Sequence, residues 1–282
     1  MVPPRYRVFL WAGPLIALGW LLIAVLDPDP PGRMGEYVGM GVFFGTMFGQ
    51  TTLASTWVAF GPAPLVWRLP LSFFWVVMLA IAIGINLGLN GGPDEAVVVV
   101  GGCLLAQWFL VQLPLWGLAM GYGLRLRHRD EFGPGTDPSE RQFGIRQLMI
   151  ITAIVGVVFG IGRLVATNLG DRIKGGHEVA IFAFLSIAAI VITVPVLLAS
   201  MMPRLALPAT ILALLLVGFA TAWELPLLRS IGAGRGGGPD AMHFIWINVF
   251  TTAWILGIAV VVRLNGYRLA TPGLGLAIHA KR

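Results

Sequence analysis

Hydrophobic residues recur along the chain in long blocks, separated by short stretches rich in proline, glycine and charged residues. The blocks run roughly 18 to 25 residues, the length at which a helix crosses the hydrocarbon core of a bilayer. Continuous apolar runs, as over residues 150–159, favour helices over the alternating strands of a membrane β-barrel. We therefore predict an all-α, polytopic membrane protein with about eight transmembrane helices. The predicted spans are Val8–Leu26, Tyr37–Phe60, Leu71–Leu89, Ala96–Leu118, Leu148–Val165, Val179–Met202, Leu205–Leu228 and Phe244–Val262.

Composition supports the membrane interpretation. Hydrophobic residues make up 57% of the 282 residues and charged residues 11%, with a mean hydropathy of +0.84. Soluble domains carry about a quarter charged residues. A surface with so few charges would not stay dispersed in water, which excludes an ordinary soluble protein.

The 19 Lys and Arg residues give a net charge of +6, which alone would also fit a nucleic-acid-binding protein. They lie mostly between the apolar blocks, and more of them fall on the side that holds the two termini and the central loop, residues 119–147. Loops rich in Lys and Arg stay in the cytoplasm. We therefore predict a cell (inner) membrane protein with both termini in the cytoplasm. Its expected partners are the lipid bilayer and proteins within the membrane, not nucleic acid.

The central loop divides the chain into two halves of four predicted spans each, residues 1–125 and 148–282, the second with a short C-terminal tail. The linker, residues 126–147, contains the segment Asp137-Pro138-Ser139-Glu140. An N-cap Asp, a Pro at the first helical position and a Glu at the third are typical of a helix start. We expect this helix to begin at the membrane surface and to continue into the fifth span.

Short matches between the halves indicate a duplication. Arg68-Leu-Pro-Leu71 opens the third span and Arg204-Leu-Ala-Leu207 opens the seventh. Gly121-Tyr122-Gly-Leu-Arg125-Leu closes the fourth span, and the similar Gly266-Tyr267-Arg268-Leu269 follows the eighth. Both halves begin and end on the same side, so a repeat would be parallel, related by an axis along the membrane normal. Matches this short also arise by chance, and both explanations stay open.

One segment carries a resemblance to known proteins. Gln142-Phe-Gly-Ile-Arg-Gln-Leu148 leads into an apolar span that ends in Gly-Ile-Gly-Arg163, and Gly61-Pro-Ala-Pro-Leu-Val-Trp-Arg-Leu-Pro70 lies in the first half. The chain resembles uncharacterised bacterial multi-pass membrane proteins that carry a Gln-Phe-x-[Ile/Leu]-Arg lead into a span. Gly144 stands where those proteins often have Ser. The resemblance implies a membrane location and no particular activity, cofactor or site residue.

Small residues recur on one face of two predicted spans: Gly41, Gly45 and Gly49 in the second, and Gly156 and Gly160 in the fifth. Glycines at this spacing let helix backbones approach closely, which is how helices associate in lipid. We predict that these faces pack against other helices. The alternative is a narrow polar path lined by the neighbouring threonines, with Gln50 beside it.

Two ionisable residues lie within predicted spans, Arg163 in the fifth and Glu224 in the seventh. Both spans run outward, so the two side chains should lie at similar depth near the outer interface. Charges inside a membrane tend to pair, because an unpaired charge is costly to desolvate. We predict an ion pair between Arg163 and Glu224, with Arg229 or interfacial water as the competing partner of Glu224.

No cofactor or catalytic residue is predicted. The glycine-rich segment from Gly232 to Gly237 joins two spans instead of a strand and a helix, so it is interpreted as a loop and not as a dinucleotide site. One outer-face cluster has the residue types of a zinc site, but without the spacing of a metalloprotease motif. Its members are His177, Glu178, Glu224 and His243.

Three hypotheses for function follow. The first is a non-enzymatic membrane protein, structural or accessory, that acts through helix packing and protein contacts. The second is a transporter for a small solute or ion. The repeat and the prolines within spans support this hypothesis, whereas the absence of a charge near the predicted midplane argues against it. The third is an intramembrane metal-dependent enzyme that uses the outer His/Glu cluster. A dry, glycine-packed core would favour the first, a central polar cavity the second, and convergent His and carboxylate side chains the third.

Overall fold

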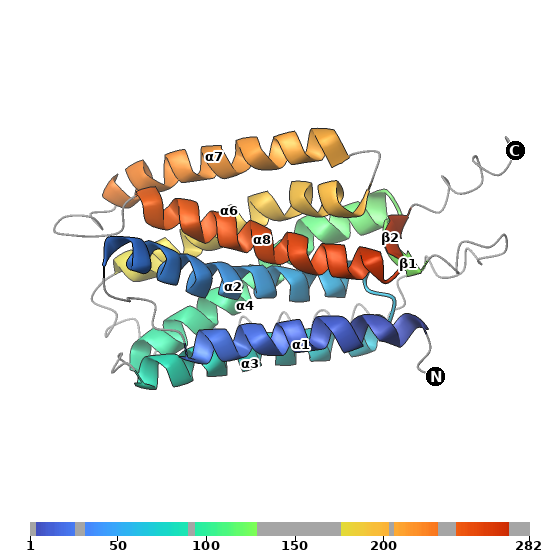
Figure 1. Cartoon of the computed structure of the whole chain (residues 1–282), viewed down its shortest axis with the longest axis horizontal. Helices are drawn as coiled ribbons and strands as arrows, with labels where there is room; N and C mark the ends of the chain where they lie inside the picture. The colour runs from blue at the N-terminus through green and yellow to red at the C-terminus, as the bar shows by residue number, and fades with distance from the viewer. Residues whose placement is uncertain are drawn as a thin grey trace, which may run out of the picture.

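The computed structural model describes residues 4–25, 32–89, 94–128, 176–202, 206–230 and 241–270. Within these ranges the chain forms seven α-helices and two short β-strands. The helices are α1 (Pro4–Val25), α2 (Arg33–Phe60), α3 (Leu65–Leu89), α4 (Asp94–Gly121), α6 (Gly176–Met201), α7 (Ala206–Ser230) and α8 (Ala241–Leu264). The strands are β1 (Arg125–His128) and β2 (Tyr267–Ala270). The helices run side by side along one long axis, with both strands at one end, called the β end below (Figure 1).

Each described helix overlaps one predicted span, and most helices begin before the apolar block does. Helix α2 begins at Arg33 and not at Tyr37, and α3 begins at Leu65 and not at Leu71, so that Pro70 lies inside the helix. Apolar blocks mark the part of a helix that needs an apolar environment, whereas hydrogen bonding continues through the polar residues at its ends. The predicted fifth span, residues 148–165, lies outside the described residues.

Three described helices are long and apolar enough to cross a membrane: Leu65–Leu89, Val100–Gly121 within α4, and Ala241–Leu264. The apolar stretches of α1, α6 and α7 whose side chains are described are shorter: Leu15–Ala24, Val191–Met201 and Thr210–Ala220. Helix α2 has the length, but its glycines, threonines and Gln50 lower its hydropathy. The predicted total of eight spans therefore rests on the sequence pattern, and the structure supports a mostly helical chain with three potential spans among the described residues.

The polar and apolar surfaces of the bundle are arranged as in a membrane protein. Five amide side chains are buried among the described residues: Gln50, Asn86, Gln107, Gln112 and Asn248. Helix α7, by contrast, exposes a row of large apolar side chains: Leu207, Ile211, Leu214, Leu215 and Phe219. An apolar patch of this kind is unfavourable in water, whereas in a bilayer it faces lipid and the polar groups pair inside.

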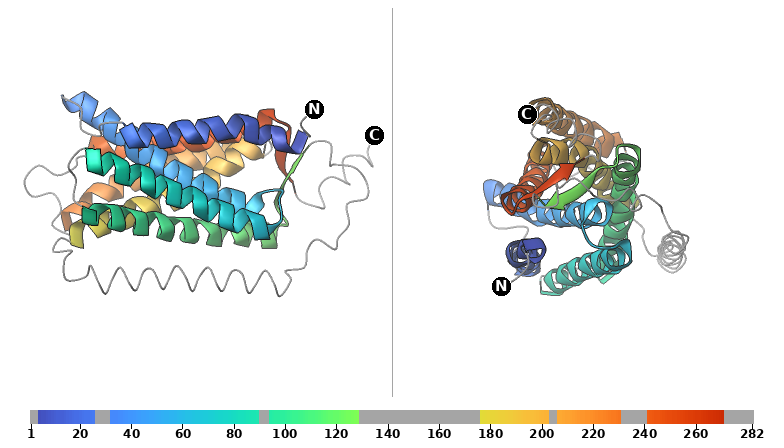
Figure 2. Two further views of the ribbon diagram at one scale, coloured as in Figure 1. Left: turned by 90° about the horizontal axis from the view of Figure 1, so that it is seen from below. Right: turned by 90° about the vertical axis from the view of Figure 1, so that its right-hand side faces the viewer.

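Helix α2 is the central element of the bundle. It contacts α1, α3, α4, α6 and α8, and its residues from Thr46 to Ser55 are all buried. The end-on view in Figure 2 shows α2 between α1 and the second-half helices. Every group on the faces of α2 must therefore fit against a protein neighbour, and this is where the polar side chains gather.

The strands β1 and β2 form a two-stranded antiparallel ribbon, which the sequence analysis did not predict. Leu126 lies opposite Leu269, and Arg127 lies opposite Arg268. The chain leaves α4 and α8 through Gly123 (φ 65°) and Gly266 (φ 86°), a left-handed conformation that glycine adopts without strain. Figure 2 shows the ribbon lying across the end of the bundle.

The helix contacts of the two halves correspond. If α2, α3 and α4 are exchanged with α6, α7 and α8, each principal contact between these helices maps onto another: α2 with α8 onto α6 with α4, and α2 with α3 onto α6 with α7. The ribbon follows the same exchange, because Gly123-Leu-Arg-Leu126 and Gly266-Tyr-Arg-Leu269 match, and their final leucines lie opposite each other. A twofold axis between these leucines would relate the halves.

Candidate functional site: a buried polar network and an apolar cavity

Helices α2 and α8 pack closely through three glycines spaced four residues apart: Gly41, Gly45 and Gly49. A Cβ added to Gly45 would lie 2.5 Å from Phe250 Cβ, and one added to Gly41 or Gly49 would lie 2.8 Å from Trp246 Cβ or Trp254 Cβ. The aromatic residues of α8 thus form a ridge, also spaced by four, that fills the groove left by the missing side chains. No space remains there for a water-filled path.

The G-x-x-x-G spacing alone does not identify such a contact. A Cβ added to Gly88, Gly117 or Gly121 would meet nothing within 4 Å. These glycines share the spacing of the α2 set but face no packed neighbour among the described residues. Gly156 and Gly160, the predicted packing residues of the fifth span, lie outside the described residues.

A hydrogen-bond network joins α2, α3 and α4 in the interior. Ser55 Oγ donates to the carbonyl oxygen of Trp108 at 2.9 Å, and Trp108 Nε1 donates to Ser72 Oγ at 3.2 Å. Gln107 Nε2 donates to the carbonyl oxygen of Phe48 at 3.1 Å. The side chains of Ser55, Ser72, Gln107 and Trp108 are all fully buried. Such bonds hold helices together where no water can replace them.

Gln50 joins α2 to two further helices. Its Nε2 donates to the carbonyl oxygen of Ile16 in α1 at 3.1 Å, and its Oε1 accepts a hydrogen bond from Trp75 Nε1 in α3 at 3.1 Å. Both polar atoms of the amide are therefore used in helix contacts. The indole N–H of Trp75 is thereby directed into the bundle, toward α2.

The network consists of amides, hydroxyls, indoles and backbone carbonyls, none of which titrates near neutral pH. Gln107 Oε1 is buried and has no hydrogen-bond partner among the described residues. A nucleophile activated by a base would need a titratable neighbour, and the described part of the network contains none. Its chemistry suits helix fixation.

An apolar cavity of about 400 Å³ lies at the β end. Residues of α1, α2, α3, α6, α8 and both strands line it. Six aromatic side chains contribute: Trp20, Trp57, Phe60, Phe74, Trp75 and Tyr267. The polar lining is small, so the cavity suits hydrocarbon better than a hydrated solute.

Two basic residues lie near this cavity. A Cβ on Gly61, which lines the cavity, would lie 2.9 Å from Arg68 Cδ, so the Arg68 side chain lies beside the cavity wall there. Arg68 Nε is buried and has no hydrogen-bond partner among the described residues. Arg125, at the start of β1, lies close enough for its charge to act on Arg68.

The ribbon presents its two faces differently, because side chains alternate along a strand. Leu126, Tyr267 and Leu269 line the cavity. Their neighbours Arg127 and Arg268, which lie opposite each other in the ribbon, project from the opposite face. The ribbon is therefore an amphipathic cover over the β end.

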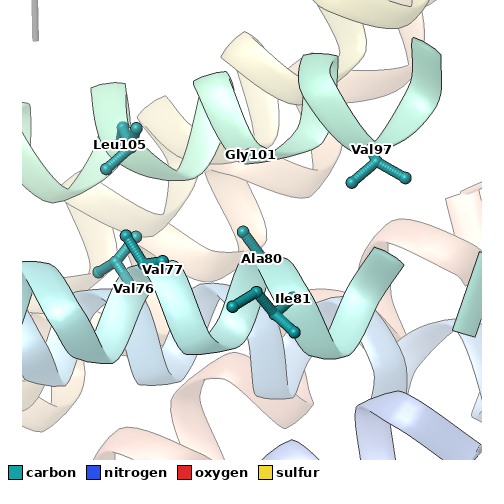
Figure 3. Close-up of a pocket in the computed structure, with 7 residues that line it drawn as sticks. All are labelled: Val76, Val77, Ala80, Ile81, Val97, Gly101 and Leu105. Carbon is teal, nitrogen blue, oxygen red and sulfur yellow. The ribbon is translucent and has the colours of Figure 1, made fainter. Parts of the chain in front are cut away.

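A second apolar hollow, of about 200 Å³, lies between α3 and α4. Figure 3 shows Val76, Ala80 and Leu105 among the side chains that line it. Its residues are Val, Ala, Ile, Leu and Gly only, so it offers no group for chemistry or orientation.

At the opposite end of the bundle, His243 Nε2 lies 3.1 Å from Glu36 Oε1, and the Tyr37 ring meets the imidazole edge-on with centroids 4.8 Å apart. His243 was predicted near His177, Glu178 and Glu224. The side chains of those three residues lie outside the description. Among the described residues no group of three or more His, Cys, Asp or Glu could hold a metal ion.

The predicted ion pair is not described either. Arg163 lies outside the described residues, and although Glu224 lies in α7, its side chain is outside the description. The pairing of Arg163 with Glu224 stays a prediction.

No protein-family model, no curated protein and no solved structure matches the chain. The geometry of the chain itself is thus the basis for a proposal about its function.

Proposed function

We propose that the chain is a non-enzymatic integral membrane protein with a structural or accessory role, built as a closed bundle of eight spans. The observation that carries this proposal is the packing of α2. Its glycines lie against the aromatic ridge of α8, and its polar side chains bond to neighbouring helices. A central helix held in this way supports neighbouring helices and leaves no polar path beside it.

The count of eight spans combines the described helices with the predicted span at residues 148–165. An even count places the N-terminus, the β ribbon and the C-terminal end on one face of the membrane. The arginines of the ribbon, Arg125, Arg127 and Arg268, then lie with the other basic segments, as expected for the cytoplasmic side of a cell (inner) membrane. We propose this orientation.

We further propose that the two four-helix halves are a parallel duplication. The corresponding helix contacts and the matched ends of α4 and α8 support it. The same arrangement is found in some carriers, in which two halves rock about a central site. Transport of a small solute is therefore the second candidate function.

Solvent accessibility of the core distinguishes the two. The chain has a single cysteine, Cys103, so Cys103→Ala gives a cysteine-free background. In that background, Thr52→Cys introduces a thiol at a fully buried position of α2, and Tyr122→Cys introduces one at an exposed position of the β end. In membranes, a water-soluble maleimide should label the thiol at 122 and leave the thiol at 52 unlabelled until the protein is denatured.

Labelling at position 52 in the native membrane, at a rate near that at position 122, would show water beside α2 and would favour the carrier. If neither thiol reacts before denaturation, the β end is not exposed as proposed.

The predicted ion pair has its own test. Arg163→Met and Glu224→Gln are combined in a double-mutant cycle, read as thermal stability in detergent. We expect the double variant to lose less than the sum of the single losses, because a lone desolvated charge is worse than none. Additive losses would mean that the two residues do not interact.

A further inference from the structure

We propose that the cavity at the β end is a binding site for an anionic phospholipid, with an acyl chain in the cavity and the phosphate at Arg68. This goes beyond the structural role proposed above. It depends only on the protein lying in a bilayer, and it holds whether or not the bundle also transports a solute.

The interior of the cavity selects hydrocarbon. Its volume is about 400 Å³ and aromatic and aliphatic side chains form most of its wall. A buried water needs two to four polar partners, which this lining does not supply at most points. Thr56, one of two hydroxyl residues on the wall, already donates to the carbonyl oxygen of Thr52 at 2.8 Å. An apolar chain needs no polar partner and would be stabilised by burying its surface against this wall.

The cavity opens toward the flank of the bundle. Leu71 and Phe74 line the cavity, yet they are 50% and 58% exposed. The cavity is partly open, and these two side chains lie on its outer side. That surface of α3 is apolar, and Trp67, one turn earlier, is 64% exposed. In a membrane the opening faces the acyl chains of the surrounding lipids, which are the most abundant apolar molecules available to fill it.

Charge at the same end selects the headgroup. Arg68 lies one turn before Leu71 on α3, close to the opening, with a buried Nε that lacks a partner among the described residues. Arg125 adds a second positive charge nearby. A phosphate offers several acceptor oxygens to a guanidinium, and basic residues at a cytoplasmic surface attract anionic lipids. The arginine therefore lies at the level where a lipid with its tail in the cavity would carry its phosphate.

The depth of the site accommodates part of an acyl chain. Along α2 the lining runs from Pro62, just beyond the helix, to Leu53. At 1.5 Å per residue this is roughly 13 Å. The ribbon closes the end above it with Leu126 and Leu269.

The experiment measures retained and added lipid by native mass spectrometry of the whole chain in detergent. The probes are phosphatidylglycerol, phosphatidylcholine with the same acyl chains, and inorganic phosphate. We expect phosphatidylglycerol to bind about tenfold more tightly than phosphatidylcholine. Both lipids carry the phosphate, but the choline cation of phosphatidylcholine is repelled by the positive charges of Arg68 and Arg125. Inorganic phosphate alone should give no stable adduct, because most of the contact is with the tail.

Two pairs of variants locate the site. Gly13 lines the cavity and a Cβ there would meet nothing within 4 Å, so Gly13→Phe starts from open space and places a ring where it can occupy the cavity. Gly257 is equally open but lies outside the cavity lining, so Gly257→Phe is the matched control. Arg68→Gln removes the charge at the site, and Arg33→Gln removes an exposed charge at the other end.

We expect Gly13→Phe to lower the affinity for both lipids at least tenfold, while Gly257→Phe leaves both unchanged. Arg68→Gln should remove the preference for phosphatidylglycerol, and Arg33→Gln should keep it. Equal binding of phosphatidylglycerol by the Gly13→Phe and Gly257→Phe proteins would overturn the proposal. The proposal would also be overturned if the unmodified chain bound both lipids equally. An inorganic phosphate adduct as stable as the lipid adduct would overturn it too, because it would indicate a phosphate site without an acyl chain.

Discussion

Gly45→Leu tests the contact between α2 and α8 directly. The first atom that the substitution adds, the Cβ, would lie 2.5 Å from Phe250 Cβ, 2.8 Å from the backbone nitrogen of Thr251 and 3.0 Å from the carbonyl carbon of Phe250. Two of these three atoms belong to the backbone of α8, so a change of side-chain rotamer cannot relieve the contact. One helix must move away from the other.

The size of the effect follows from these distances. Carbon atoms pack at about 3.5 to 4.0 Å, so the helices must separate locally by about 1 Å before the rest of the leucine is placed. Overpacking of this kind costs about 1 to 3 kcal/mol, occasionally more. At roughly 2 to 4 °C per kcal/mol for a protein of this size, the midpoint of thermal unfolding should fall by about 2 to 12 °C.

The assay is thermal unfolding in detergent, followed by circular dichroism at a fixed lipid content. Val42→Leu is the first control, since Val42 is only half-buried on a neighbouring face of α2. Gly45→Ala and Gly257→Ala form a second pair with the same chemical change. Alanine should raise the stability at Gly257 by roughly 0.5 to 1 kcal/mol through helix propensity, and it should lower the stability at Gly45. Equal midpoints for the two leucine variants, or for the two alanine variants, would refute close packing of α2 on α8.

Two further predictions concern the network and the topology. Ser72→Ala removes the acceptor of the buried Trp108 Nε1 and should lower the free energy of unfolding by about 1 to 3 kcal/mol. Ser200→Ala should be nearly neutral, because the Ser200 hydroxyl bonds only within its own helix in the described structure. Thermal unfolding compares the two variants, and equal losses of stability would contradict the network. Reporter fusions after Arg129 and after Gly237 should report cytoplasm and outside, respectively, and an outside signal at Arg129 would contradict the even number of spans in the first half.

The sequence was sufficient to predict the packing face of α2 but not its partner. Spacing by four places Gly41, Gly45 and Gly49 on one side of a helix whatever the neighbour is. Trp246, Phe250 and Trp254 repeat the same spacing in α8, and this complementary ridge was the available signal. Which two helices meet depends on contacts between residues some 200 positions apart in the chain, which local periodicity does not specify.

Two contacts and one element were missed. Tryptophan is common at the membrane interface, so nothing in the sequence indicated that the Trp75 indole bonds to Gln50. Glu36 was left outside the second span, since it precedes the apolar block, and so the actual neighbour of His243 was overlooked. The ribbon was missed because strands of four residues are too short for alternation to stand out among the arginines of the loop.

The β ribbon has a consequence for biogenesis. Its two strands follow α4 and α8, so β1 leaves the ribosome long before its pairing partner exists. Some 140 residues separate Arg127 from Arg268, and at 5 to 20 residues per second their synthesis takes roughly 7 to 30 seconds. During that interval the backbone edge of β1 lacks the partner that it has in the finished protein. The ribbon can close only once β2 has been synthesised after α8, and a chain truncated before Tyr267 would never acquire it.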